Sequence, residues 1–209
     1  VSLLIDRDGL LWVGSREGLF RYDGYQATPF LPDPDHPGSI SDQDVRALYE
    51  ATDGALWVST NTGGLNRRDP RTGRFTQFHH DSKNPRTLSD ESIFGVAEDA
   101  EGRIWVGTQN GLNRLNADGR SFVRYFHASG DAGSLAQNWV YALHRGASRR
   151  LWIGTVGGGI DRWDGTNGKF EHFPLAQLAG GSRALDDVFA IHEAPDGRVW
   201  GGTREGLVV

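Results

Sequence analysis

The chain has 209 residues, of which 37% are hydrophobic and 23% charged, and its formal net charge is −5. This length can bury a substantial core, and the absence of any basic run excludes the electrostatic footprint of a nucleic-acid-binding protein, so we expect no nucleic-acid partner. No cysteine is present, which excludes disulfides, thiolate zinc sites and a thiol nucleophile.

A phrase centred on tryptophan recurs five times along the chain: LLWVGS, ALWVST, RIWVGT, RLWIGT and RVWGGT. Its tryptophans, from Trp12 to Trp200, are 45, 48, 47 and 48 residues apart, a period typical of one four-stranded β-propeller blade. The sequence therefore predicts an all-β fold, a β-propeller fragment with four complete blades and most of a fifth. The repeats cover about 1–40, 41–88, 89–135, 136–184 and an incomplete 185–209 of a single partial propeller domain, residues 1–209. We expect it to be part of a larger propeller of about seven blades.

Each repeat begins with a predicted inner strand that carries a small residue at one position. These residues are Ser2, Ala47, Gly95, Ala142 and Ala190. Inner strands of neighbouring blades converge at the axis of a propeller, where large side chains would collide. A turn with an acidic residue and glycine, such as Asp53-Gly54, follows in four repeats and tolerates positive φ. Ser148-Arg149 stands there in the fourth repeat, so we expect a different type of turn.

The second predicted strand carries the tryptophan, the third follows a glycine turn, and the fourth carries aromatic residues. A basic residue recurs in the third strand at Arg21, Arg67, Arg114 and Arg162. The connections between repeats have equal lengths, and we expect them to be loops: residues 31–44, 79–92, 126–139 and 174–187. The fifth repeat stops at Val209, within its predicted third strand.

Three of the repeats carry a specific family pattern. The phrases SIS…V…L…DGALWVSTNTGGLNR, TLS…I…V…EGRIWVGTQNGLNR and SLA…V…L…RRLWIGTVGGGIDR resemble the two-component regulator propeller repeat. The resemblance covers nearly the whole chain, with departures at Ser59, Gly201 and Ser148-Arg149. It implies the periplasmic sensor part of an inner-membrane receptor, either a hybrid histidine kinase or a diguanylate-cyclase receptor. Many members of this family respond to carbohydrate fragments.

The resemblance also implies partners and a location. It implies a small-molecule or oligosaccharide ligand and a homodimer formed through the propeller or through domains outside this chain. No apolar run approaches the roughly 20 residues that a membrane-spanning helix needs. We therefore expect contact with the membrane only through parts of the receptor outside this chain.

In a propeller, the connections between blades share one face with the turns between second and third strands, and we expect a ligand there. Trp139 stands where the other repeats have Asp44, Ser92 and Asp187, so it either forms a stacking platform or packs against the neighbouring blade. The polar turn residues either hydrogen-bond to sugar hydroxyls or are simply solvated. They are Arg16, Glu17, Asn61, Thr62, Gln109, Asn110, Arg204 and Glu205.

The sequence offers little support for catalysis, a cofactor or a metal. Glu17 and Glu205, in matching SREG and TREG phrases, are the best pair for a glycosidase, but inheritance of one repeated turn explains them as well. The run His79-His80-Asp81 is interpreted as a surface loop because adjacent histidines point apart. We expect a sensor domain that is not itself an enzyme, with no cofactor and no metal. The alternatives are a structural or protein-interaction propeller without a small ligand and, less favoured, a propeller lyase or glycoside hydrolase.

Overall fold

The computed structural model describes residues 1–163, 165 and 168–209, and these form five separate antiparallel β-sheets. Blade 1 comprises β1 (Ser2–Ile5), β2 (Leu11–Ser15), β3 (Gly18–Tyr22) and β4 (Ala27–Phe30). Blade 2 comprises β5 (Val45–Glu50), β6 (Leu56–Thr60), β7 (Leu65–Arg68) and β8 (Phe75–Phe78). Blade 3 comprises β9 (Ile93–Glu98), β10 (Ile104–Thr108), β11 (Gly111–Leu115) and β12 (Phe122–Tyr125). Blade 4 comprises β13 (Val140–Arg145), β14 (Leu151–Thr155), β15 (Gly159–Trp163) and β16 (Phe170–Phe173), and blade 5 comprises β17 (Val188–Glu193), β18 (Val199–Thr203) and β19 (Gly206–Val208).

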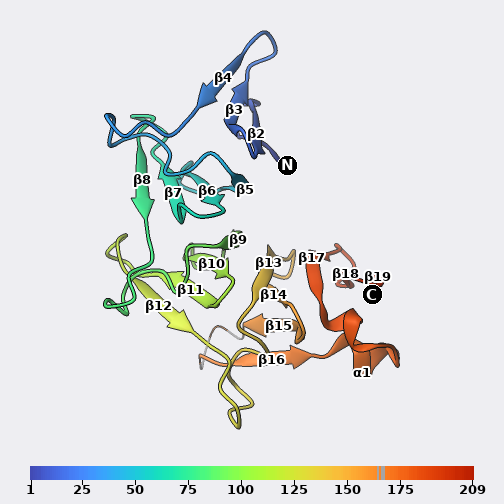
Figure 1. Ribbon diagram of the computed structural model, residues 1–209. Coiled ribbons are helices and arrows are strands. Elements are labelled where there is room, and N and C mark those ends of the chain that lie inside the picture. Colours follow the sequence, from blue (N-terminus) through green and yellow to red (C-terminus); the bar gives the residue numbers. More distant parts are fainter. Residues whose placement is uncertain (164, 166–167) are drawn as a thin grey trace.

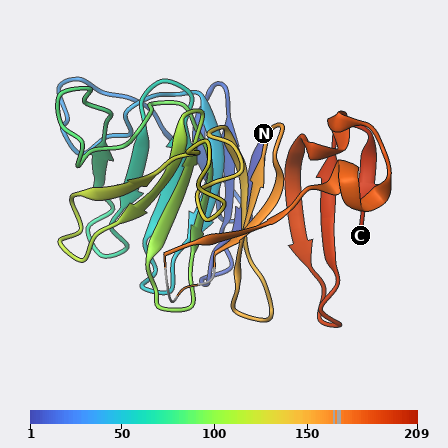
Figure 2. The ribbon, with the colours of Figure 1, turned by 90° about the horizontal axis from the view of Figure 1, so that it is seen from below.

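The blades form an arc around a shared centre, with β5, β9, β13 and β17 nearest to that centre (Figure 1). Within each blade, consecutive strands pair antiparallel, so every sheet is a simple meander. Each inner strand contacts the inner strand of the next blade, from β1 through β5, β9 and β13 to β17. Seen after a quarter turn, the turns and connections gather at two opposite ends of the blades (Figure 2). These observations confirm the predicted propeller architecture.

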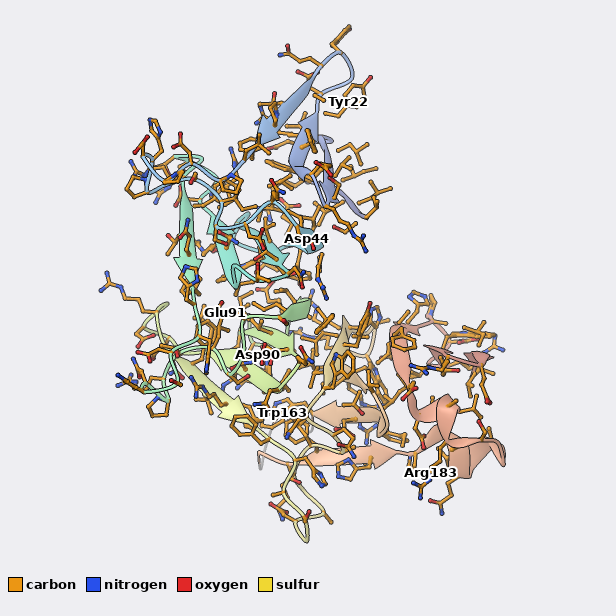
Figure 3. The ribbon with its side chains drawn as sticks, in the orientation of Figure 1. Tyr22, Asp44, Asp90, Glu91, Trp163 and Arg183 are labelled. Carbon is orange, nitrogen blue, oxygen red and sulfur yellow. The ribbon has the colours of Figure 1, made fainter. Side chains whose placement is uncertain are left out.

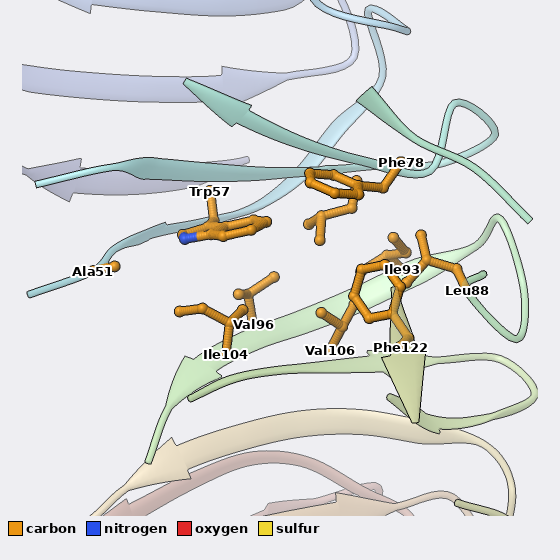
Figure 4. Close-up of a cluster of buried hydrophobic side chains, with 10 residues drawn as sticks. Ala51, Trp57, Phe78, Leu88, Ile93, Val96, Ile104, Val106 and Phe122 are labelled. Carbon is orange, nitrogen blue, oxygen red and sulfur yellow. The ribbon is translucent and has the colours of Figure 1, made fainter. Parts of the chain in front are cut away.

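The hydrophobic core lies between the blades. Trp57 stacks on Phe78 with ring centroids 5.8 Å apart, and Phe78 meets Phe122 of the next blade edge-on at 5.7 Å (Figure 4). Ile104 and Val106 of blade 3 close the same cluster and are almost fully buried. The tryptophan phrase therefore stabilises the fold by burying a large ring against the neighbouring sheet.

Carboxylates satisfy the indole N–H of three repeat tryptophans. In blades 1 and 3 the acceptor is an aspartate at the end of the inner strand of the same repeat, at 2.7 Å in Trp12–Asp6 and 2.6 Å in Trp105–Asp99. Blade 4 has Gly146 at that place, and Trp152 donates instead to Glu193 of blade 5 at 2.6 Å. A Cβ atom on Gly146 would lie only 1.8 Å from an oxygen of Glu193. The glycine and the glutamate thus replace the aspartate as a pair.

A second recurrent contact joins the entrance of the inner strand to the third strand of the same blade in blades 2, 3 and 4. Asn66 and Asn113 each accept a hydrogen bond from the backbone N–H of a serine and donate one to its hydroxyl. Blade 4 has Asp161 at this position, fully buried, where it accepts from the backbone of Ala136 at 2.8 Å and pairs with His172 Nδ1 at 2.7 Å. Burial raises the pKa of Asp161, although its hydrogen bonds from Ala136 and His172 act in the opposite direction.

Two sequence expectations fail locally. The connection 174–187 contains a short helix, α1 (Leu175–Ala179), and a 3₁₀ turn, Arg183–Asp186, where a loop was expected. The turn at Ser148-Arg149 was expected to differ from the others, and this is wrong. Arg149 adopts a φ of 64° and donates its N–H to Gly146 at 2.9 Å, as Gly54 does to Ala51 at 2.9 Å. The Arg149 side chain also bonds to the carbonyl oxygen of Ala100 at 2.7 Å, which helps to offset the strain of a left-handed arginine.

Candidate functional site

β-bulges at the inner strands give blades 2 to 5 a common feature. In β5, for example, Val45 pairs with Thr60 and Ala47 with Ser59, so Arg46 is left between the two pairs. The residues left over in this way are Arg46, Phe94, Tyr141 and Phe189. A bulge redirects the side chain of its extra residue, and bulges are frequent beside active sites.

These four side chains, which we call the bulge stack, contact one another in sequence around the centre of the arc. The Arg46 guanidinium carbon lies 4.9 Å from the centroid of the Phe94 ring. Phe94 and Tyr141 stack at 4.8 Å with an interplanar angle of 26°, and Tyr141 meets Phe189 edge-on at 5.0 Å. All four are half-buried. Aromatic stacking and the cation–π contact hold them as one rigid wall formed by four blades.

A cavity of about 630 Å³ opens beside the Arg46 end of the bulge stack. It is lined by Val1, Arg16, Asp44, Val45, Arg46, Phe94 and Tyr141. Asp44 lies at the inner edge of blade 2, where the chain enters β5 (Figure 3). The volume falls in the range of small-molecule pockets, and the lining combines aromatic surface with a few charged groups.

The structure brings three of the predicted ligand-binding residues close to this wall. Trp139 is 39% exposed, and its ring lies 5.9 Å from that of Phe94 at an angle of 50°. Arg16 lines the cavity directly. The Asn61 side chain accepts a hydrogen bond from Arg46 and so fixes the guanidinium at the end of the stack. Trp139 is therefore neither buried nor isolated: it packs on the neighbouring blade and keeps a solvent-facing surface.

Trp139 and Asn61 contact the bulge stack without lining the cavity, and the other predicted residues also lie outside its lining, where most make turn contacts. Thr62 donates from its N–H and its hydroxyl to Asp42, at 3.0 and 2.8 Å. Although burial opposes ionisation, these bonds hold the pKa of Asp42 below its ordinary value. Arg204 forms an ion pair with Asp187 at 3.1 Å, and Glu205 accepts a hydrogen bond from Ser182. The others are exposed turn residues: Glu17, Gln109 and Asn110.

Backbone hydrogen bonds set the geometry of this face. The turn after the second strand donates an N–H to the residue that precedes the bulged strand of its own blade, in blades 2 to 5. The pairs are Asn61 to Asp44 at 2.9 Å, Gln109 to Ser92 at 3.0 Å, Val156 to Trp139 at 2.9 Å and Arg204 to Asp187 at 3.2 Å. The predicted sharing of one face by these turns and connections is confirmed.

Sequence reasoning missed the bulge stack itself. A signal was present, because the residue before each small inner-strand residue is large: Arg46, Phe94, Tyr141 and Phe189. The pattern alone suggests an ordinary strand, since the extra residue becomes visible only from the pairing with the second strand.

The histidine loops brace the connections. His80 Nδ1 lies 2.7 Å from the carbonyl oxygen of Leu88, and His127 Nδ1 lies 2.8 Å from that of Leu135. Within the described part of the chain, no group of three or more His, Cys, Asp or Glu residues is placed to hold a metal ion. In the same part, no helix is long and apolar enough to span a membrane. The histidines therefore have a structural explanation in two successive repeats.

Comparison with known families identifies the repeats. The family model described as Two component regulator propeller matches residues 39–62 and 87–110. These segments cover the entrance, inner strand and tryptophan phrase of blades 2 and 3. The chain matches the two-component regulator propeller repeat in blades 2 and 3. A search of curated protein sequences finds no match.

Solved structures share the architecture of these two-component regulator propeller repeats. An extracellular domain of a hybrid two component system from B. thetaiotaomicron, BT3049, is 22% identical with a TM-score of 0.82, and a second, BT4673, is 21% identical with a TM-score of 0.73. The match covers 99% and 97% of this chain, but only 28% of either neighbour. A streptogramin B lyase is 20% identical with a TM-score of 0.69, over 96% of this chain and 60% of the lyase. At these identities the likeness establishes the propeller fold.

Proposed function

We propose that this chain is the ligand-binding part of a sensor propeller, in a receptor whose sensor region lies in the periplasm. The bulge stack carries the proposal, because four blades contribute one residue each to a single aromatic wall beside a cavity of about 630 Å³. The family match to Two component regulator propeller supports a role in signalling. The neighbours described as extracellular domains of hybrid two component systems support an extracytoplasmic location.

The chemistry of the face favours a saccharide or another small polyhydroxylated ligand. Trp139 offers an exposed ring for the apolar face of a sugar, while Arg16, Asp44 and Arg46 offer charged hydrogen-bonding groups for hydroxyls. Trp139 packs against Phe94 of the bulge stack, so binding at Trp139 would cost little ordering entropy. In a receptor dimer, a ligand with higher affinity for one arrangement of the two copies shifts the population toward it.

The residues that line the cavity support a role in binding better than a role in catalysis. Among the described residues that line it, Asp44 is the single carboxylate, whereas a glycosidase needs two at a controlled separation. Glu17 and Glu205 are not among its lining residues. The propeller fold shared with a lyase carries no chemistry by itself. We therefore propose a non-enzymatic role.

Calorimetric titration against a panel of neutral and acidic oligosaccharides tests the proposal. We expect one member to bind, and we expect Trp139→Ala to weaken that binding about tenfold or more, because tryptophan is among the residue types that contribute most to binding free energy. Tyr25→Ala is the matched control, since Tyr25 is 96% exposed on blade 1 and lies away from the stack. Absence of binding across the panel would favour a protein-interaction propeller, and equal affinity of both variants would place the ligand elsewhere.

A further inference from the structure

The last residue of the third strand packs over the tryptophan of the preceding blade, and blade 3 has a smaller side chain there than blade 4. In blade 4 this residue is Trp163, whose ring lies 4.9 Å from that of Trp105. In blade 3 it is Leu115, which packs against the cluster around Trp57 of blade 2. Leucine covers less of an indole ring than tryptophan does, so space remains beside Trp57.

The indole N–H of Trp57 also lacks the acceptor that other blades provide. Asp6 and Asp99 accept the N–H of their own tryptophans in blades 1 and 3, whereas blade 2 has Ala51 at that place. The ring nitrogen of Trp57 faces Ala51 (Figure 4), and no residue in the described part of the chain accepts a hydrogen bond from it. Trp57 is only 2% exposed, and an unpaired donor buried to this degree destabilises the fold unless another group bonds to it.

Glu98 does not replace the missing aspartate. It is the counterpart of Glu193, since each ends the inner strand of its blade, and Glu193 accepts the N–H of Trp152 in the preceding blade. Glu98 instead accepts from the N–H and the hydroxyl of Thr52, at 2.8 and 2.5 Å. A carboxylate can accept about four hydrogen bonds, so Glu98 retains lone pairs for a further donor.

A cavity of about 550 Å³ lies where these residues leave space between blades 2 and 3. Trp57, Phe78, Ile104 and Leu115 supply its apolar surface, and Glu98 is among the polar residues that line it. The volume falls in the range of small-molecule pockets. The cavity therefore offers an aromatic surface, a buried N–H donor and a carboxylate acceptor to one ligand.

The charges that line this cavity balance. Asp53 and Arg67 pair with each other at 2.8 Å, and Thr52 holds Glu98. The other charged residue of the lining is Arg120, which is exposed on the turn between β11 and β12. Two carboxylates and two arginines leave no net charge, so the lining favours an uncharged ligand over an ion.

This cavity and the bulge stack lie at opposite ends of blade 2. Arg46 is the second residue of β5, whereas Ala51 and Thr52 follow the end of that strand. A ligand in this cavity would therefore bind beside the turns between first and second strands, away from the site described above.

We propose that this cavity binds an uncharged, planar aromatic ligand that carries a hydrogen-bond acceptor and a donor on one edge, such as an aromatic carboxamide or a heteroaromatic lactam. Its ring takes the place beside Trp57 that Trp163 fills beside Trp105 in the next interface. The acceptor receives the N–H of Trp57, and the donor bonds to Glu98. The ligand thus supplies the two groups that blades 2 and 3 lack here, a ring and an acceptor.

Nuclear magnetic resonance of the ¹⁵N-labelled chain tests the site directly. The probes are nicotinamide, uracil and 2-pyridone, and we expect at least one to move the Nε1–Hε1 signal of Trp57, which Trp57→Phe assigns by its loss. The signals of Trp12 and Trp105 should stay in place, because aspartates already accept their N–H groups. Cyclohexanecarboxamide, which has the amide without a planar ring, and benzoate, which is charged, should have little effect. An unmoved Trp57 signal with all three probes, or an equal shift with cyclohexanecarboxamide, would overturn the proposal.

A variant that fills the cavity tests its location. Leu115→Trp installs the residue that blade 4 carries at this position, and we expect it to weaken binding of the probe about tenfold or more, because the new ring takes the space of the ligand. Tyr22→Trp is the matched control: it places the same ring at the same position of blade 1, outside this lining, and should retain the affinity of the wild type. Equal affinity of Leu115→Trp and the wild type would show that the probe binds elsewhere and would refute the site. The titration of the wild type decides the question even if Leu115→Trp does not fold.

Discussion

In blade 4, Gly146 and Glu193 together replace the aspartate of blades 1 and 3, and the loss of stability on removing Glu193 can be predicted. Glu193 is 5% exposed and accepts from Trp152 Nε1 at 2.6 Å, from the Ser148 hydroxyl at 2.8 Å and from the Ser148 N–H at 3.2 Å. Glu193→Ala leaves the indole N–H, in a side chain only 6% exposed, without an acceptor. Ser148 is exposed, so water can replace its two bonds, and the buried indole dominates the cost. The expected loss is about 2–4 kcal/mol, which lowers the unfolding midpoint by about 4–16 °C in a domain of this size.

Restoring the aspartate that blades 1 and 3 carry should give the indole N–H of Trp152 a new acceptor and recover stability. Gly146→Asp alone should destabilise, because the new Cβ would meet Glu193. Gly146→Asp combined with Glu193→Arg copies the contact between blades 3 and 4, where Asp99 accepts from Trp105 and Arg145 donates to the carbonyl oxygen of Asp99 at 3.3 Å. We expect the double variant to regain at least half of the loss measured for Glu193→Ala in a urea titration. Strict additivity of the losses measured for Gly146→Asp and for Glu193→Arg alone would refute the pairing.

The same contact has a pH signature. Although burial opposes ionisation, the hydrogen bonds from Trp152 and Ser148 hold the pKa of Glu193 below its ordinary 4.5. Its stabilisation should therefore be complete above pH 4.5 and disappear as the pH falls through the lowered pKa. The difference in stability between the wild type and Glu193→Ala should shrink in that window, and a constant difference would contradict the assignment.

Other substitutions follow from the same repeat logic. Asp161→Asn should remove one pH-dependent component: since the folded pKa of Asp161 is raised above 3.8, its contribution is full below 3.8 and is lost as the pH rises through the raised value. Urea midpoints of the wild type and this variant from pH 3.5 to 7 should therefore change relative to each other, and parallel curves would contradict this. Gly107→Ala should destabilise by about 1–3 kcal/mol, because its Cβ would lie 2.7 Å from Val140 Cγ1 of the next blade. Gly119→Ala is its control for a glycine with open space around it, with the strain of a φ of 64° as its sole cost, and equal losses would show that the contact between blades is not tight.

The architecture was predictable from the sequence because it follows from the spacing of the repeated tryptophan phrases. Each tryptophan phrase marks a second strand, and the glycine turns mark the hairpins, so the five sheets and the incomplete fifth blade follow directly. The Arg149 turn was not predictable, since its left-handed φ is accepted only because neighbouring hydrogen bonds fix the loop. The short helix α1 lies in a connection that is as long as each of the other three connections between blades. The length of this segment therefore gave no indication of a helix.

The candidate site was predictable only in part, because it depends on register. Trp139 was identified from its place in a polar column, and the structure puts it on Phe94. The four residues of the bulge stack depend on a shift of one residue between paired strands, which no single strand reveals.

Among the described residues, the main contacts between blades link each sheet to its sequence neighbours, as in a one-dimensional array. In such an array, cooperativity decays with the number of interfaces, and opening starts at whichever end is held least. The second strands of blades 2, 3 and 4 are buried along their whole length, whereas those of blades 1 and 5, β2 and β18, are buried only at intervals. Amide hydrogen exchange should therefore be slower in the three inner blades than in blades 1 and 5, and a ligand that bridges several blades would oppose opening at the ends of the array.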